Sequence, residues 1–266
     1  MNRIKETFEK LKAKNEKALV AFVTAGDPNI KKSLSIIKNM HKAGVDILEL
    51  GIPFSDPTAD GPVIQRASAR ALKQGVNIKA VLKLTKSIRE FTNIPIILFG
   101  YYNPIHLYGN KKFYIDAVSA GADGLLIVDL PPEESDEMTN EWEGNKLALI
   151  RLIALTTPKD RIKKIADSAS GFLYLVSKIG VTGSAGIDTT LSADKFKIIR
   201  SITDLPVCVG FGISTPEHVS SVASFADGIV IGSAFEKTIE KNIDNPELES
   251  IIAKQTDEYK KATKNR

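Results

Sequence analysis

Short apolar runs recur along the chain and alternate with segments of helical periodicity. Near-continuous apolar sequence is typical of strands covered on both faces, as in a parallel sheet. Eight such runs, rich in β-branched and aromatic residues, predict strands at 18–26, 46–53, 95–102, 123–131, 147–155, 171–177, 206–213 and 227–234.

The segments between these runs place apolar residues three and four positions apart, which forms one stripe along a helix. In the segment 30–44 the predicted stripe comprises Ile30, Leu34, Ile37 and Met40. Similar patterns predict further helices at 62–74, 78–91, 111–120, 133–144, 158–168, 192–203, 216–223 and 246–262.

The order of these elements predicts an α/β fold of the (β/α)8 TIM-barrel type. Successive strands begin 21 to 49 residues apart with helical segments between them, as right-handed βα units require. Eight units in about 250 residues are typical of the barrel. An open doubly wound sheet is the alternative, but no phosphate-binding G-x-G-x-x-G follows the first strand to favour it.

No Ser-, Pro- or Gly-rich linker divides the chain, which predicts a single barrel domain over residues 1–266. An extra N-terminal helix, with Ile4, Phe8 and Leu11 on one face, is expected to cap the bottom of the barrel. The segments AGVDILELG, AGADGLLIV and FADGIVIG resemble one another. Each reads as a helix end, a turn and a strand start, as repeated βα units would give.

Composition narrows the class of protein without defining it. A net charge of +4, with both signs interspersed, gives no argument for a nucleic-acid partner. The N-terminal sequence lacks the apolar core of a secretory signal, and no apolar run approaches the ~18 residues of a membrane span. These features predict a cytoplasmic protein with neither nucleic acid nor membrane as a partner.

The sequence predicts neither a disulfide nor a metal site. The single cysteine, Cys208, excludes an internal disulfide and a Cys-based zinc site, and it is expected to be a core residue. The three histidines, His41, His106 and His218, lie in different segments without a neighbouring ligand at coordinating spacing. We therefore expect no metal.

One carboxylate stands out within a predicted strand. Side chains alternate along a strand, so in DILELGIP the side chain of Glu49 shares a face with Ile47, opposite Leu48 and Leu50. The outer face of a barrel strand must be apolar, which points Glu49 inward near the C-terminal end of the strand, where barrels place their active sites. Desolvation there raises the pKa of a carboxyl group and suits it to general acid–base catalysis. A structural glutamate paired with a buried cation is the alternative.

The loop PFSDPTADGP follows directly and carries two further carboxylates, Asp56 and Asp60. Either could be a turn or capping residue. The loop begins four residues after Glu49, however, so it must lie over the same mouth of the barrel. Asp60 is therefore a second catalytic candidate.

Glycines gather at the ends of the last strands. Loops after strands seven and eight, together with a short helix N-terminus, are the usual phosphate site of barrels. Gly212, Gly232 and Ser233 are thus candidates for a phosphate cradle, which Gly183 would join from the sixth loop. Tight turns alone are the alternative explanation for these glycines.

Taken in order, these motifs resemble the tryptophan synthase alpha subunit family. The resemblance is carried by LELGIPFSDPTADGPVIQ (48–65), FVTAGDP (22–28), YYNPI (101–105), DLPPEES (129–135), YLVSKIGVTG (174–183) and GFGIS (210–214), and it spans nearly the whole chain. Two positions depart from the family pattern. Thr58 stands where Leu or Val is frequent, and Arg151 where Pro is common.

The resemblance implies a lyase of tryptophan biosynthesis that cleaves indole-3-glycerol phosphate to indole and glyceraldehyde 3-phosphate by a retro-aldol reaction, without metal or cofactor. The family's catalytic pair falls on Glu49 and Asp60, and its phosphate-binding residues fall on the four cradle candidates. Its indole-pocket aromatics fall on Phe22, Tyr174 and Phe211.

The resemblance also implies a beta-subunit partner in an alpha2-beta2 heterotetramer. That partner would hold pyridoxal phosphate and receive the indole. The partner is expected to dock at the mouth, with Asp56 as a candidate charge contact. The loops 53–61 and 178–191 are expected to become ordered when substrate and partner bind.

Three alternative functions remain at this stage. A class I aldolase would use Lys178, just past the sixth strand, as a Schiff-base lysine. A phosphate-sugar isomerase would use the cradle but would not need an indole pocket. A degenerate alpha subunit would only activate its partner, although intact Glu49 and Asp60 argue against that function.

Overall fold

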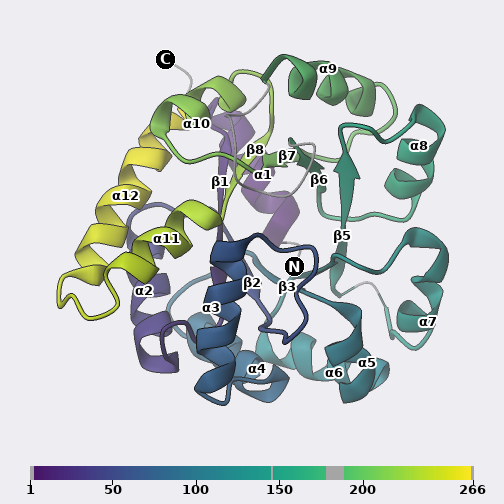
Figure 1. Ribbon diagram of the computed structural model, residues 1–266. Coiled ribbons are helices and arrows are strands. Elements are labelled where there is room, and N and C mark those ends of the chain that lie inside the picture. The colour runs from purple at the N-terminus through teal and green to yellow at the C-terminus, as the bar shows by residue number, and fades with distance from the viewer. Residues whose placement is uncertain (1–2, 145, 178–188, 265–266) are drawn as a thin grey trace.

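Eight parallel strands form a closed barrel in a computed structural model that describes residues 3–144, 146–177 and 189–264 (Figure 1). Each strand pairs with its sequence neighbours, and β8 closes the barrel against β1. Closure confirms the (β/α)8 barrel and excludes the open sheet. The strands are β1 (Ala18–Thr24), β2 (Ile47–Gly51), β3 (Ile96–Gly100), β4 (Gly124–Ile127), β5 (Ala148–Ala154), β6 (Leu173–Val176), β7 (Val207–Gly210) and β8 (Gly228–Ile231).

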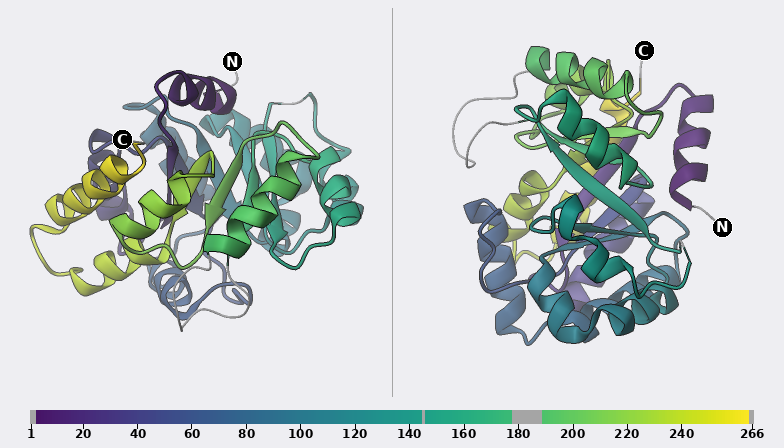
Figure 2. Two further views of the ribbon diagram at one scale, coloured as in Figure 1. Left: turned by 90° about the horizontal axis from the view of Figure 1, so that it is seen from above. Right: turned by 90° about the vertical axis from the view of Figure 1, so that its right-hand side faces the viewer.

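The helices surround the barrel and cover its outer face (Figures 1 and 2). Within the described residues none is long and apolar enough to cross a membrane. They are α1 (Arg3–Ala13), α2 (Ile30–Lys42), α3 (Pro62–Lys73), α4 (Ile78–Arg89), α5 (Tyr102–Tyr108), α6 (Asn110–Ala120), the 3-10 turn η1 (Pro132–Glu134), α7 (Asp136–Thr139), α8 (Lys159–Asp167), α9 (Thr189–Arg200), α10 (Pro216–Ala223), α11 (Ser233–Lys241) and α12 (Leu248–Ala262).

Helix α1 closes the bottom of the barrel, as predicted. Its buried face packs Ile4, Phe8 and Leu11 into the apolar cluster that fills the barrel interior. The ring of Phe8 lies 6.0 Å from that of Phe172, which immediately precedes β6. In Figure 2 this helix lies at the end of the barrel opposite the loop that follows β2. The other end is therefore the open mouth.

The three similar sequence segments share one structural device. Asp46, Asp123 and Asp227 each stand just before a strand and accept an N–H group from the first or second residue of the preceding strand, at 2.8–2.9 Å. Each carboxylate also binds a basic side chain, Lys260, Arg89 and Arg200 respectively. The repeated aspartate thus fixes neighbouring strands to one another at the bottom of the barrel.

The sequence prediction was wrong at several element boundaries. The segment 133–144 forms only η1 and the short α7, because Met138 is the one side chain these two elements bury and no stripe holds a longer helix. Strands β3 and β8 end earlier than expected, at Gly100 and Ile231, and the helices α5 and α11 follow them.

The apolar stripe of α2 is also displaced from the prediction. Its buried residues are Ser33, Ile36, Ile37 and Met40, whereas the side chain of Ile30 is exposed. Ile30 is the first residue of the helix, next to the loop that joins it to β1, so it lies at the edge of the core.

Candidate active site

Glu49 lies inside the barrel, as strand alternation predicts. Its neighbour Ile47 belongs to the interior cluster, whereas Leu48 and Leu50 pack outward against the helices. On the adjacent strands Glu49 is level with Phe22 of β1 and Ile97 of β3. The side chain is buried to 1% exposure, so the carboxyl group is almost fully removed from solvent.

This carboxyl group has no compensating partner among the described residues. Neither of its oxygens accepts a hydrogen bond from them. None of these residues is therefore the buried cation with which a purely structural glutamate would pair. Burial raises the pKa of Glu49 to about 8. Burial also raises the pKa of Tyr174 and of Cys208, two side chains of the barrel interior, and the charge of Glu49 raises both further. Glu49 is thus protonated at neutral pH, in a shell of apolar and weakly polar groups.

Asp60 is half-buried in the loop that joins β2 to α3. Burial raises the pKa of Asp60 to about 6, and a hydrogen bond from the Tyr101 hydroxyl opposes that rise. The same hydroxyl accepts the N–H of Ala59 at 3.0 Å. Tyr101 follows β3 directly, so it fixes the loop and its carboxylate over the mouth. Tyr101 lies in the YYNPI segment, and nothing in that segment alone indicates this role.

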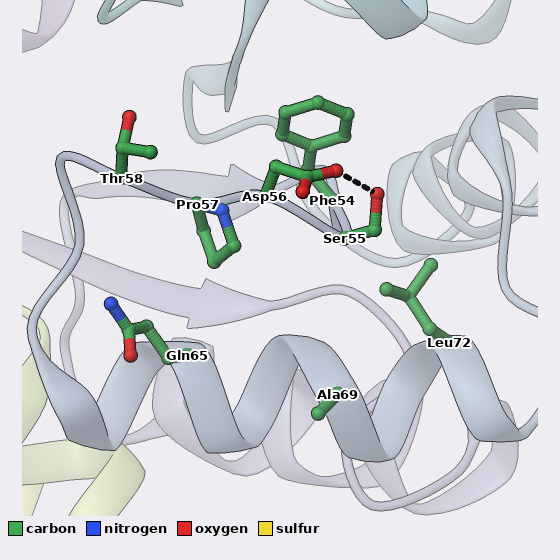
Figure 3. A pocket seen from close by; sticks show the side chains of 8 residues that line it. All are labelled: Phe54, Ser55, Asp56, Pro57, Thr58, Gln65, Ala69 and Leu72. Atoms are coloured by element: carbon green, nitrogen blue, oxygen red, sulfur yellow. Dashed lines mark hydrogen bonds between the residues drawn. The ribbon is translucent and has the colours of Figure 1, made fainter.

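The rest of this loop packs on α3. The hydroxyl of Ser68 contacts both the N–H and the carbonyl of Phe54, at 2.9 and 3.0 Å. A cavity of about 300 Å³ lies between the loop and α3; Figure 3 shows Gln65, Ala69 and Leu72 on the helix side. Asp56 is exposed there and accepts the Ser55 hydroxyl at 2.5 Å. The loop is therefore held at both ends of its path and is exposed at its tip.

Of the three predicted aromatic residues, Phe22 lies level with Glu49, and Tyr174 and Phe211 contact each other. Phe22 occupies the neighbouring register position on β1 and meets Phe99 edge-on, with ring centroids 5.1 Å apart. Tyr174 is buried in the barrel interior and meets Phe211 edge-on, with ring centroids 6.3 Å apart. These rings supply apolar walls of a kind that suits a flat aromatic ligand. Phe99, which was not predicted as a site residue, belongs to the same wall through its contact with Phe22.

The predicted glycines lie at the ends of β7 and β8. Gly212 has a φ of 77°, a left-handed conformation that glycine adopts without strain, and Phe211 before it has a φ of 84°. Gly232 immediately precedes α11, and a Cβ atom there would lie 3.2 Å from the Cβ of Phe22. Ser233 is the first residue of α11, whose first-turn N–H groups lack intrahelical acceptors. Gly183 and Lys178 lie outside the described residues.

A serine missed by the sequence analysis holds this end of β7. The hydroxyl of Ser177 lies 2.6 Å from the carbonyl of Gly210 and 2.8 Å from that of Phe211. These contacts explain how Phe211 is kept in a conformation that non-glycine residues rarely adopt. No pattern in the sequence distinguishes this serine from others that follow strands.

The remaining candidates contribute to packing rather than to this mouth. Cys208 is fully buried in the barrel interior, as predicted. Arg151 is buried on the outer face of β5, where it donates to the Leu130 carbonyl at 3.0 Å. Among the residues that the structure describes, no three His, Cys, Asp or Glu side chains could hold a metal ion together.

A closed parallel barrel with a desolvated carboxyl group inside its mouth, and a second carboxyl group on the loop above, defines a barrel enzyme of the acid–base class. A family model described as "Tryptophan synthase alpha chain" matches residues 8–264. The chain belongs to the tryptophan synthase alpha chain family. It is a lyase of tryptophan biosynthesis, and its reaction is the cleavage of indole-3-glycerol phosphate to indole and glyceraldehyde 3-phosphate.

Similar proteins support this family over the full length. The tryptophan synthase alpha chains of Desulfatibacillum aliphaticivorans and Desulfosudis oleivorans are each 61% identical over 264 residues, which is 99% of this chain and 100% of either relative. The crystal structure of tryptophan synthase subunit alpha from Legionella pneumophila is 39% identical, with a TM-score of 0.92 and complete coverage of both chains. The family match favours this reaction over the isomerase and Schiff-base aldolase alternatives.

Proposed function

We propose that Glu49 carries the proton in this cleavage and that Asp60 stabilises the cation formed on the way. The observation that supports this assignment is the separation of the two pKa values by environment, about 8 for Glu49 and about 6 for Asp60. At neutral pH, Glu49 then holds its proton while Asp60 is ionised. Two carboxyl groups whose environments separate their pKa values are a recurrent acid–base arrangement.

The steps follow from these protonation states. Glu49 donates its proton to C3 of the indole ring, which becomes a cation with its charge on the ring nitrogen. The ionised Asp60 accepts the ring N–H and stabilises that charge. The Glu49 carboxylate then removes the proton from the hydroxyl group next to the breaking bond. The C–C bond electrons return to the ring, which releases indole and the aldehyde and leaves Glu49 protonated again.

We also propose where the two ends of the substrate bind. The indole ring would lie among Phe22, Tyr174 and Phe211, within reach of Glu49. The phosphate would lie against Gly212, Gly232 and Ser233, where glycine permits close approach and the N-terminus of α11 favours an anion. Contact between Phe22 and Gly232 joins the two subsites.

Ser233→Asp is expected to raise the KM for indole-3-glycerol phosphate about tenfold or more, because a carboxylate would compete with the phosphate for the same N–H groups. Thermal stability should be maintained, since Asp is a favourable residue at a helix N-terminus. Steady-state kinetics and a melting curve check both points. The control is Ser220→Asp, at an exposed position of α10. An unchanged KM in Ser233→Asp would contradict the cradle.

The family implies a beta-subunit partner, and we propose that it docks at the mouth in an alpha2-beta2 heterotetramer. Pyridoxal phosphate would belong to that partner, and this chain would work without a cofactor of its own. The exposed side chain of Asp56, in the loop that lies over the mouth after β2, supports this face.

Amide hydrogen exchange in residues 53–61 is expected to slow when the beta subunit and substrate bind. Several loop residues are exposed in the free chain, and loops of this kind open at low free energy. The measurement compares the free chain with the complex. Equal protection in both states would contradict gating by this loop, and new protection at α1 would place the partner at the bottom. The other loop expected to become ordered, 178–191, lies largely outside the described residues.

We propose one barrel domain over residues 1–266 that works in the cytoplasm, with neither nucleic acid nor membrane as a partner.

The reaction is tested by mixing the purified chain with indole-3-glycerol phosphate and measuring indole release, with and without a beta subunit. Absence of indole under both conditions would contradict it.

A further inference from the structure

Five charged or ionisable side chains form a cluster behind the phosphate cradle, between α3, α11 and the loop after β1. Arg70 binds both carboxylate oxygens of Asp27 at 2.8 Å, through Nε and Nη2. Its Nη1 donates to Glu240 at 2.8 Å, and Arg66 binds Glu240 through two further hydrogen bonds. The fifth member, Glu236, lies one turn before Glu240 on α11. We call these five residues the Arg70 cluster.

Glu236 is the member without a counter-ion. It is fully buried, and its Oε1 accepts the N–H of Thr24 at 2.6 Å. Its Oε2 accepts no hydrogen bond from the described residues, and the carboxylate of Asp27 lies beside it. Two adjacent buried carboxylates cannot both ionise at low free energy. A proton on Oε2 removes the conflict, because the carboxyl group can then donate to Asp27.

The other four members of the cluster carry no net charge, which favours a neutral Glu236. Arg66 and Arg70 balance Asp27 and Glu240, so ionisation of Glu236 would leave one uncompensated negative charge in a buried site. Burial, and then the charge of Asp27, raise the pKa of Glu236 to about 8. The two arginines instead lower the pKa of the more exposed Glu240 to about 2.

The position of Glu236 links this cluster to the cradle. It is the fourth residue of the helix that begins at Ser233, and its acceptor contact ties that helix to the end of β1, two residues after Phe22. We infer that Glu236, in its neutral form, is a positioning residue that holds the N-terminus of α11 in the orientation that binds the substrate phosphate. This inference rests on the proposed phosphate cradle.

Ionisation of Glu236 should weaken that orientation. An ionised Glu236 would repel the carboxylate of Asp27, which lies in the loop after β1. The two arginines of α3 could not compensate the new charge, because they already bind Asp27 and Glu240. Helix α12 also packs on α11, through Tyr259 against Phe235, but the Tyr259 hydroxyl donates to the Ser214 carbonyl. None of these contacts supplies a free cation, and the added charge lies one turn from the groups that meet the phosphate.

The test is the affinity for glycerol 3-phosphate from about pH 7 to about pH 9.5, measured by calorimetry. The phosphate monoester is already doubly ionised in this window, since its second pKa is about 6. All chains carry Glu49→Gln, which removes the titration of Glu49, whose pKa is also about 8. With Glu236 present, the affinity should fall at least about fivefold with rising pH, the lower end for coupled sites.

Glu236→Gln should keep the affinity seen at about pH 7 and lose most of the fall, because its amide can still donate to Asp27 and accept from Thr24. Glu236→Val, which can do neither, should bind weakly at every pH. The control Glu258→Gln, at an exposed position of α12, should behave like the parent chain.

An equal fall with pH in Glu236→Gln would overturn the inference, as would weak binding by Glu236→Gln at about pH 7. Failure of the cradle itself has a different signature. If Ser233→Asp bound glycerol 3-phosphate as tightly as the parent chain, the phosphate would lie elsewhere, whatever the pH dependence.

Discussion

Glu49→Gln is expected to lower indole release by at least ~10²–10⁴-fold, the range for loss of a general acid–base group. The amide keeps the shape of the side chain but cannot donate the proton to C3 and then take one from the hydroxyl group. Substrate affinity should change little, because the indole and phosphate contacts remain. Turnover and binding of indole-3-glycerol phosphate are measured separately. A variant that kept a tenth of the parent turnover would contradict the assignment.

The same variant should be more stable than the parent chain. Glu49 has a pKa of about 8 when folded and 4.5 as the reference value. Between these values the native state binds more protons than the unfolded state, so the stability contributed by this group falls as pH rises. Removing the group should add on the order of 3 kcal/mol to the free energy of unfolding at pH 7.

Urea unfolding from about pH 5 to about pH 8 measures this effect. The parent chain should lose stability across the window, and Glu49→Gln should lose less. Loss of activity together with loss of stability would instead indicate that Glu49 has a structural role.

Asp60→Asn is the second large effect, and it should lower kcat more than it raises KM. The amide can still meet the ring nitrogen but has no charge to stabilise the cation, so the lost interaction belongs to the transition state. A fall of about 10²-fold or more in kcat is expected from loss of such electrostatic stabilisation.

Tyr101→Phe is the matched control, because it changes the positioning of the Asp60 carboxylate without removing its charge. It removes the hydroxyl that bonds Asp60 and Ala59 but leaves the carboxylate in place. Its kcat should lie between those of the parent chain and Asp60→Asn. If Asp60→Asn raised KM alone, Asp60 would provide uniform binding and no transition-state stabilisation.

The sequence predicted those parts of the site that local rules govern. Alternation along β2 pointed Glu49 inward, and the short distance along the chain placed the next loop over the same mouth. A Cβ added at Gly232 would crowd Phe22 at 3.2 Å, and only the closure of the barrel brings these two residues of the first and last βα units together. Glycine at that strand end was nevertheless a usable signal.

Contacts between distant segments could not be predicted. The carboxyl group of Glu236 meets Thr24 and Asp27 only because β8 pairs with β1, and nothing along the chain marks their register. Tyr101 and Ser177 act through hydrogen bonds to loops from other βα units. The helix predicted at 133–144 was too long for a different reason: a periodic pattern does not reveal that Met138 is the one side chain buried by η1 and α7.

The proposed mechanism depends most on the protonation state of Glu49, and carbon-13 NMR of the glutamate side-chain carboxyl groups measures it directly. Comparison with Glu49→Gln assigns the signal, and comparison with Glu236→Gln separates it from the other glutamate whose pKa is about 8. The Glu49 signal should titrate near pH 8, so that the group is protonated at neutral pH. Titration near the ordinary value of 4.5 would contradict the mechanism, because Glu49 would then have no proton to give at neutral pH.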